Sequence, residues 1–174
     1  NAPRPRIFRL ALSDGKESFF MASSTLVWLR NDLRIADNPA LAAALKHDAP
    51  VHAVYVLETD RGLRPLGGAA KVWLHESLKG LNGDLAERGV RLSYREGDSA
   101  TLIPELVRET GAERVYWNRR YDPAGRAHDA ALKSALKSDG IEAESFNAAL
   151  LLEPWDIATK QGTPYGVFTP FWNA

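Results

Sequence analysis

Charged and polar side chains follow two apolar runs of the chain at the points where those runs end. The segment RNDLRIADN begins directly after TLVWL, and the segment NRRYDP begins directly after ERVYW. Guanidinium groups are planar donors that suit anionic or flat polar ligands, and the helix starts that follow each segment would add positive dipole ends. We therefore expect both segments to line a ligand crevice, with contacts from Arg30, Arg34, Asn118, Arg119, Arg120 and Tyr121.

A second interpretation leaves the same arginines without a ligand. Arg30 is close in sequence to Asp32, and Arg34 is close to Asp37. Exposed ion pairs of this kind are common and contribute little free energy, so such pairs would do no more than order the loop. For each single arginine, ligand binding and a loop-ordering ion pair both stay open. For the crevice as a whole, the convergence of two such segments favours ligand binding.

A parallel sheet with connecting helices would bring the two segments together. β-prone runs at 25–30, 51–58, 90–97, 113–118 and 141–146 alternate with helical patterns at 40–47, 69–88, 100–110 and 123–137. N-cap signals precede the helices at Asn38-Pro39, at Asp98 or Ser99, and at Asp122-Pro123, as is typical of helix starts. The pattern predicts the α/β class: a five-stranded parallel sheet, doubly wound and Rossmann-like. In the common order of such sheets the first and fourth strands are neighbours, and ligands bind beyond their carboxyl ends.

Large apolar residues mark the expected core. Trp28 and Trp117 occupy equivalent places in the first and fourth strands, and we expect both to be buried. Helical spacing also predicts burial of a row in the second helix, formed by Trp73, Leu74, Leu78, Leu81 and Leu85.

Composition limits the possible functions. The chain has 174 residues, 45% of them hydrophobic, which suits one domain with a substantial core. Lys plus Arg and Asp plus Glu both number 22, and this neutrality argues against a main role in docking nucleic acid. Without cysteine, disulfides and thiolate metal sites are excluded, and a reducing cytoplasm is compatible.

Catalytic, metal and membrane signals are weak. The four histidines have no metal-ligand spacing, nothing resembles a nucleophile and its base, and neither a G-x-G-x-x-G nor a Walker A loop occurs. We therefore predict no catalytic residue and no metal site. No apolar run approaches the roughly 18 residues that span a bilayer, so we expect no membrane partner and a cytoplasmic location.

The two ends of the chain differ from its middle. Residues 1–20 contain Pro and Arg early and show no clear period, so we interpret them as an extension outside the core, with Met21 as the natural start. Residues 151–174 are rich in Pro, Gly and aromatic residues, which indicates an irregular connector with a small hairpin around Gln161-Gly162. We expect its aromatic side chains to pack on this domain or on another one, and the chain to be a piece of a longer protein.

Three motifs together resemble one protein family. VWLRNDLRIADNPAL, YWNRRYDPAGRAHDAAL and GTPYGVFTPFWNA are similar, in this order, to segments of the DNA photolyase/cryptochrome family. The resemblance implies that 21–150 is the family's α/β antenna domain and that 151–174 begins the linker to a helical FAD-binding domain outside this chain. It also implies an antenna pigment, which is methenyltetrahydrofolate in many members and a deazaflavin or FMN in others.

By position, the resemblance implies pigment contacts after three of the strands and at the start of the second helix. Different pigments use different subsets of these residues, which are Trp28, Leu29, Arg30, Arg34, Lys71, Gly97, Asp98, Asn118, Arg119, Tyr121 and Asp122.

The resemblance implies a deoxyribodipyrimidine photolyase as the parent protein. This lyase is a flavoprotein that repairs damaged DNA with light, and its FAD and lesion site belong to the helical domain, so we expect the chain alone to be inactive. The alternatives are the same domain of a cryptochrome blue-light photoreceptor and, outside the family, a small-nucleotide-binding α/β module.

Overall fold

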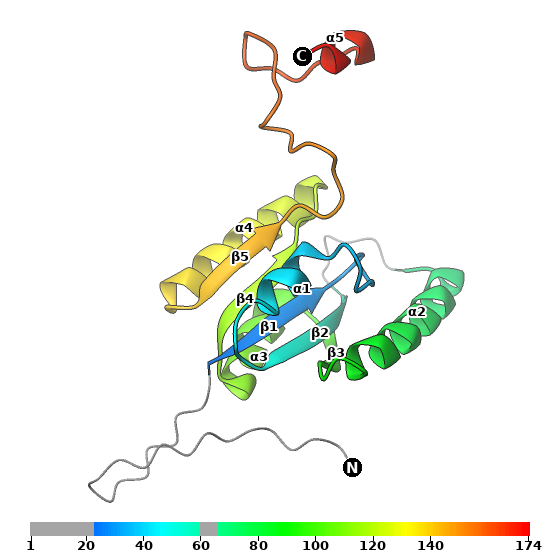
Figure 1. The fold of residues 1–174 in the computed structure, drawn as a ribbon, viewed down its shortest axis with the longest axis vertical. Helices are drawn as coiled ribbons and strands as arrows, with labels where there is room; N and C mark the ends of the chain where they lie inside the picture. The colour runs from blue at the N-terminus through cyan, green and yellow to red at the C-terminus, as the bar shows by residue number, and fades with distance from the viewer. Residues whose placement is uncertain (1–22, 60–65) are drawn as a thin grey trace, which may run out of the picture.

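The fold is seen in a computed structural model that describes residues 23–59 and 66–174, so the expectation for residues 1–20 and Met21 lies outside the described part. The strands are β1 Ser24–Leu29, β2 Val51–Glu58, β3 Arg91–Gly97, β4 Ala112–Asn118 and β5 Glu142–Phe146. The helices are α1 Pro39–Ala44, α2 Gly68–Ala86, α3 Ser99–Thr110, α4 Pro123–Ser138 and α5 Phe168–Trp172 (Figure 1).

The five strands form one parallel sheet in the order β3-β2-β1-β4-β5. Strand order therefore reverses between β1 and β4, whose carboxyl ends lie side by side. The predicted fold class and the predicted place of the reversal are both confirmed.

Helices cover both faces of the sheet because successive strand side chains point to opposite faces. Val27 and Leu29 share an apolar cluster with residues of α1 and α2, while Leu26 and Trp28 share one with residues of α3 and α4. Trp28 and Trp117 are both 0% exposed, with ring centroids 6.1 Å apart. Their predicted burial is confirmed, and the doubly wound arrangement follows from the two clusters.

The predicted burial of the α2 row is confirmed only for Leu81 and Leu85, while Leu74 and Leu78 are partly buried and the prediction is wrong for Trp73. Trp73 is 79% exposed, whereas Leu81 and Leu85 are buried with Leu92 of the edge strand β3. Only the C-terminal half of α2 thus packs firmly on the sheet, of which β3 is the edge strand among residues 23–59 and 66–174.

Side-chain caps begin three of the helices as the sequence predicts. Asn38 accepts a hydrogen bond from the Leu41 N–H (3.1 Å), Asp98 accepts one from the Ala100 N–H (2.8 Å), and Asp122 accepts one from Gly125. Asp98 and Asp122 follow the ends of β3 and β4 closely, and so these two caps fix the direction in which the chain leaves the sheet there.

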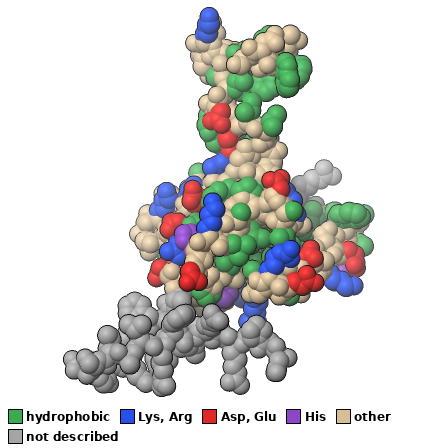
Figure 2. Space-filling view, in the orientation of Figure 1, with side chains coloured by type: hydrophobic (Ala, Val, Ile, Leu, Met, Phe, Trp, Pro, Cys, Tyr) green, Lys and Arg blue, Asp and Glu red, His purple; other side chains and the backbone are tan. Residues whose placement is uncertain are grey.

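The segment after β5 leaves the sheet and runs to α5 (Figure 1). At Gln161-Gly162 the Thr159 N–H donates to the Thr163 carbonyl (2.8 Å) and closes a turn without strands, so the hairpin prediction is wrong. Side chains around α5 form an exposed apolar surface (Figure 2), in which Phe168 and Trp172 are stacked and each 69% exposed. No helix within 23–59 or 66–174 is long and apolar enough to cross a membrane.

Candidate functional site

A cavity of about 200 Å³ lies beyond the carboxyl ends of β1 and β4, at the reversal of strand order. Three segments form its wall: the loop after β1, the loop after β4, and the start of the segment after β5. The lining residues are Arg30, Asn31, Asp32, Arg34, Asn118, Arg119, Arg120, Tyr121, Asp122, Ala148 and Ala149. The two polar segments that we singled out therefore converge on one hollow.

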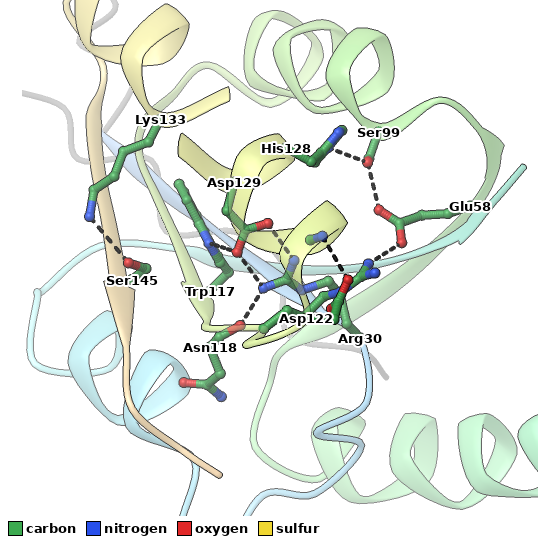
Figure 3. Close-up of polar contacts among 12 residues, drawn as sticks. Arg30, Glu58, Ser99, Trp117, Asn118, Asp122, His128, Asp129, Lys133 and Ser145 are labelled. Carbon is green, nitrogen blue, oxygen red and sulfur yellow. Dashed lines mark hydrogen bonds and ion pairs between the residues drawn. The ribbon is translucent and has the colours of Figure 1, made fainter. Parts of the chain in front are cut away.

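Arg30 is the most deeply buried of the cavity arginines, at 6% exposure. Its Nη1 donates to Asp129 Oδ1 (2.7 Å) and its Nη2 to Asp129 Oδ2 (3.0 Å) and to the Asn118 carbonyl (Figure 3). The guanidinium also lies 4.4 Å from the Trp28 ring centroid. Arg30 thus joins β1, β4 and α4, and its carboxylate partner is Asp129 rather than the expected Asp32, which bonds the Arg30 backbone N–H (2.7 Å).

The Asn118 amide is used within the fold. Its Nδ2 donates to Asp32 Oδ2 (2.5 Å) and to Asn38 Oδ1 (2.8 Å), while its Oδ1 accepts from the Ala40 N–H (3.1 Å). Both amide hydrogens are therefore taken. Asn118 fixes the start of α1 against the end of β4 and has no hydrogen left for a ligand.

Arg119 and Tyr121 hold the segment after β5. Arg119 pairs with Glu153 and donates to the Ser145 carbonyl (2.6 Å), and Tyr121 Oη lies 3.0 Å from both carboxylate oxygens of Glu153. Burial and the bond to Glu153 raise the pKa of the Tyr121 hydroxyl. Sequence reasoning missed Glu153, a carboxylate 8% exposed in the connector, because nothing local distinguishes it from a solvated glutamate.

Arg34 bridges its own loop and the same connector. Its Nε donates to the Asp37 carbonyl (3.0 Å), and its Nη2 donates to the Ala148 carbonyl (2.8 Å) and lies 3.6 Å from Asp37 Oδ2. The expected Arg34–Asp37 pair is therefore present, although the Arg34 side chain is 39% exposed.

Arg120 is held by two carboxylates. Its Nη1 donates to Glu58 Oε2 (2.6 Å) and its Nε donates to Asp122 Oδ2 (3.2 Å). Burial disfavours the charge, but the bonds to Asp122 and Glu58 outweigh it and raise the pKa of Arg120. The Gly125 N–H, which bonds Asp122 Oδ1 (2.7 Å), lowers the pKa of Asp122, and the bond from Arg120 adds to this effect.

Five residues implied by the resemblance lie outside the cavity lining. Trp28 and Leu29 are buried in the two core clusters, and Lys71 is exposed on α2. Gly97 ends β3 and Asp98 caps α3. Pigment contacts of these five residues stay predictions, whereas Arg30, Arg34, Asn118, Arg119, Tyr121 and Asp122 share the cavity.

The electrostatics of the site suit a flat hydrogen-bonding ligand better than a strong anion. Each of the four cavity arginines has a carboxylate within 4 Å, so none offers a full uncompensated charge. Within the described ranges, no cluster of His, Cys, Asp or Glu could hold a metal ion. Ser99 bonds both Glu58 and His128, but it is 0% exposed and contributes nothing to the cavity wall.

Comparison with known proteins gives consistent matches. The family model described as DNA photolyase matches residues 25–174. The chain is 50% identical over 149 residues to a deoxyribodipyrimidine photo-lyase of Agrobacterium fabrum, covering 86% of this chain and 31% of that protein. It is 39% identical over 151 residues to cryptochrome-1 of Arabidopsis thaliana, covering 86% of this chain and 22% of that protein.

Solved structures agree with the sequence matches. A bacterial class III photolyase from Agrobacterium tumefaciens superposes with a TM-score of 0.81 at 46% identity, over 93% of this chain and 33% of that one. A Synechocystis cryptochrome superposes with a TM-score of 0.75 at 27% identity, over 87% of this chain and 32% of that one. The chain therefore spans about a third or less of the length of these relatives.

Proposed function

Because the chain belongs to the DNA photolyase/cryptochrome family and corresponds to its N-terminal domain, we propose that it is the antenna domain of a light-driven DNA repair enzyme. The parent protein in this proposal is a cytoplasmic deoxyribodipyrimidine photolyase that acts on damaged DNA. Residues 21–150 form the antenna domain, and 151–174 begin the linker to a helical domain that binds FAD. The antenna pigment absorbs near-ultraviolet or blue light and passes the energy to that FAD.

The observation that carries the proposal is the cavity between the ends of β1 and β4. Its wall comes from the two motif segments that resemble the family, and ligands of open α/β sheets bind at this reversal of strand order. Sites for whole ligands measure roughly 300–1,000 Å³, so a cavity of about 200 Å³ suits the ring system of a pigment, with its tail outside.

The residues present fit such a ring system. Arg34 and Arg120 each have a terminal nitrogen without a bond to the described residues, Nη1 of Arg34 and Nη2 of Arg120, whereas both terminal nitrogens of Arg30 and Arg119 bond within the fold. A ring with carbonyl or ring-nitrogen acceptors would satisfy these donors. Methenyltetrahydrofolate, a deazaflavin and FMN all present such atoms, and the compensated arginine charges favour such a ring system over a phosphate in the cavity.

A cryptochrome photoreceptor is the second candidate, favoured by the 39% identity to the Arabidopsis cryptochrome. The same antenna domain serves both roles, and motifs of the FAD domain would separate repair from signalling. A small-nucleotide-binding module outside the family is not retained, since the family is established over residues 25–174.

The test is to fill the cavity. Ala148 lines it and is partly buried, so Ala148→Trp should abolish retention of methenyltetrahydrofolate, deazaflavin or FMN, measured by absorbance after gel filtration. Ala130→Trp places the same side chain on an exposed position of α4 and should leave retention unchanged. Both variants belong in the chain and in its full-length parent.

Two results would contradict the proposal. Failure of the unsubstituted parent to retain any of the three pigments would remove the antenna role. Equal retention by Ala148→Trp and by the unsubstituted protein would move the pigment out of the cavity, towards Lys71, Gly97 and Asp98.

A further inference from the structure

Arg120 differs from Arg30 and Arg119 in leaving one terminal guanidinium nitrogen without a bond among the residues that the structure describes. Arg30 and Arg119 each use both terminal nitrogens in bonds within the fold. Arg120 bonds through Nε and Nη1, and within the described part of the chain its Nη2 has no hydrogen-bond partner. The side chain lines the cavity and is only 17% exposed.

A relay of hydrogen bonds holds Glu58, the main partner of Arg120. Ser99 Oγ donates to Glu58 Oε1 (2.8 Å) and lies 2.9 Å from His128 Nε2 (Figure 3). A serine hydroxyl has one hydrogen, and here Glu58 receives it. His128 Nε2 must therefore carry a hydrogen and donate it to Ser99, which fixes the tautomer of a neutral His128.

A close backbone approach holds Arg120 from the other side. A Cβ at position 125 would lie 2.7 Å from Arg120 Nε and 2.6 Å from Asp122 Oδ2, so only glycine admits both side chains against the start of α4. Asp122 in turn bonds the Gly125 N–H and Arg120 Nε. Two carboxylates and one glycine thus set the plane of the Arg120 guanidinium.

We propose that Arg120 is the cation that contacts the pigment in this cavity, through Nη2, and that Ser99 and His128 are positioning residues acting through Glu58. The inference rests on the proposed antenna function and names the donor of that site. A guanidinium fixed in this way selects a flat heterocycle with a carbonyl or ring-nitrogen acceptor. The resemblance did not include Arg120 among the pigment contacts. Of the contacts that it did include, Asn118 has both amide hydrogens engaged, and Arg30 and Arg119 have both terminal nitrogens bonded within the fold.

The first experiment measures pigment affinity by titrating FMN or methenyltetrahydrofolate into the chain and its full-length parent. Arg120→Ala should weaken binding about tenfold to a hundredfold, the range for one lost charged hydrogen bond. Ser99→Ala should weaken it by about twofold to tenfold, as for a neutral bond. Arg88→Ala, which removes an exposed arginine after α2, should leave affinity unchanged.

Two further readouts separate ligand contact and positioning from general stability. Added guanidinium should restore part of the pigment binding of Arg120→Ala and none of that of Ala148→Trp, since only the first variant leaves space for the ion. Nitrogen chemical shifts of the neutral His128 ring should show the hydrogen on Nε2 in the unsubstituted chain, without any pigment. A hydrogen on Nδ1 would overturn the relay.

Each remaining outcome is decisive. If the unsubstituted protein binds a pigment and Arg120→Ala binds it equally well, Arg120 is not the contact and the antenna function stands. If the unsubstituted full-length parent binds none of methenyltetrahydrofolate, a deazaflavin and FMN, both the function and the inference fail. If Arg120→Ala does not fold, Arg120→Lys replaces it: this variant retains a charge beside Glu58 but lacks the planar second donor. Weakened binding by a folded Arg120→Lys supports the inference, and wild-type affinity overturns it.

Discussion

Replacing Arg30 with alanine should destabilise the fold strongly, although Arg30 lines a ligand cavity. The substitution removes two bonds to Asp129, one bond to the Asn118 carbonyl, and the contact with the Trp28 ring. It leaves the Asp129 carboxylate, whose side chain is 13% exposed, with the Trp117 Nε1–H (3.0 Å) as its remaining side-chain donor. Removal of one partner from a buried ion pair costs about 3–5 kcal/mol, mainly through the charge left behind.

Urea unfolding followed by tryptophan fluorescence measures this loss, since Trp28 and Trp117 are buried beside the pair. The midpoint should fall at an unchanged m-value, which identifies a change in stability rather than in the denatured state. Arg34→Ala is the matched control: its pair with Asp37 is exposed, and its loss should cost no more than about 1 kcal/mol.

A second substitution tests whether the charge left unpaired on Asp129 causes the loss of stability in Arg30→Ala. Asp129→Asn in the Arg30→Ala background removes the orphaned charge while an amide oxygen stays opposite Trp117. The double variant should therefore be more stable than Arg30→Ala alone. A loss of less than about 1 kcal/mol for Arg30→Ala, equal to that of Arg34→Ala, would refute the structural role of the buried pair.

Four other expectations follow from the same contacts. Leu85→Ala should cost about 2–5 kcal/mol in urea unfolding and Trp73→Ala at most about 0.5 kcal/mol, because only Leu85 is buried; equal losses would mean that the whole α2 row is core. Asp122→Ala should cost about 0.5–2 kcal/mol at neutral pH, and the difference should vanish as pH falls through the lowered pKa of Asp122, since the stabilisation belongs to the ionised cap; a pH-independent difference would contradict this. Deletion of residues 1–20 should shift the melting temperature by no more than about two degrees, as for surface changes, and a larger shift would give them a place in the core. The purified chain with added FAD should not repair thymine dimers under blue light, and dimer loss above a no-protein control would contradict the assignment of repair to the helical domain.

The elements of this fold were predictable because their signals are local. Asn38, Asp98 and Asp122 cap helices within three residues of themselves, and the alternation of strands and helices then permits few topologies. Burial along α2 was not predictable in the same way. Helical period marks which side of a helix is apolar, but it carries no information on whether a strand lies beneath each turn, and Trp73 is exposed.

The partners of the cavity arginines could not be predicted either. Arg30 meets Asp129 across 99 positions, and Arg119 meets Glu153 across 34. The chain has 22 acidic residues, and spacing alone favours the nearest of them, as it favoured Asp32 for Arg30. Only the packing of α4 and of the connector onto the strand ends selects the true partners.

The ligand and ion-pair interpretations of the arginines turn out to be compatible. Arg30, Arg119 and Asn118 join strand ends, helix starts and the connector, and these bonds order the loops around the cavity before any ligand arrives. A ligand bound there would gain contacts without an added cost of ordering those loops, which is the usual benefit of a preorganised site. On this view the fixed arginines shape the cavity, and recognition depends on the donors that the fold leaves over, chiefly Nη2 of Arg120.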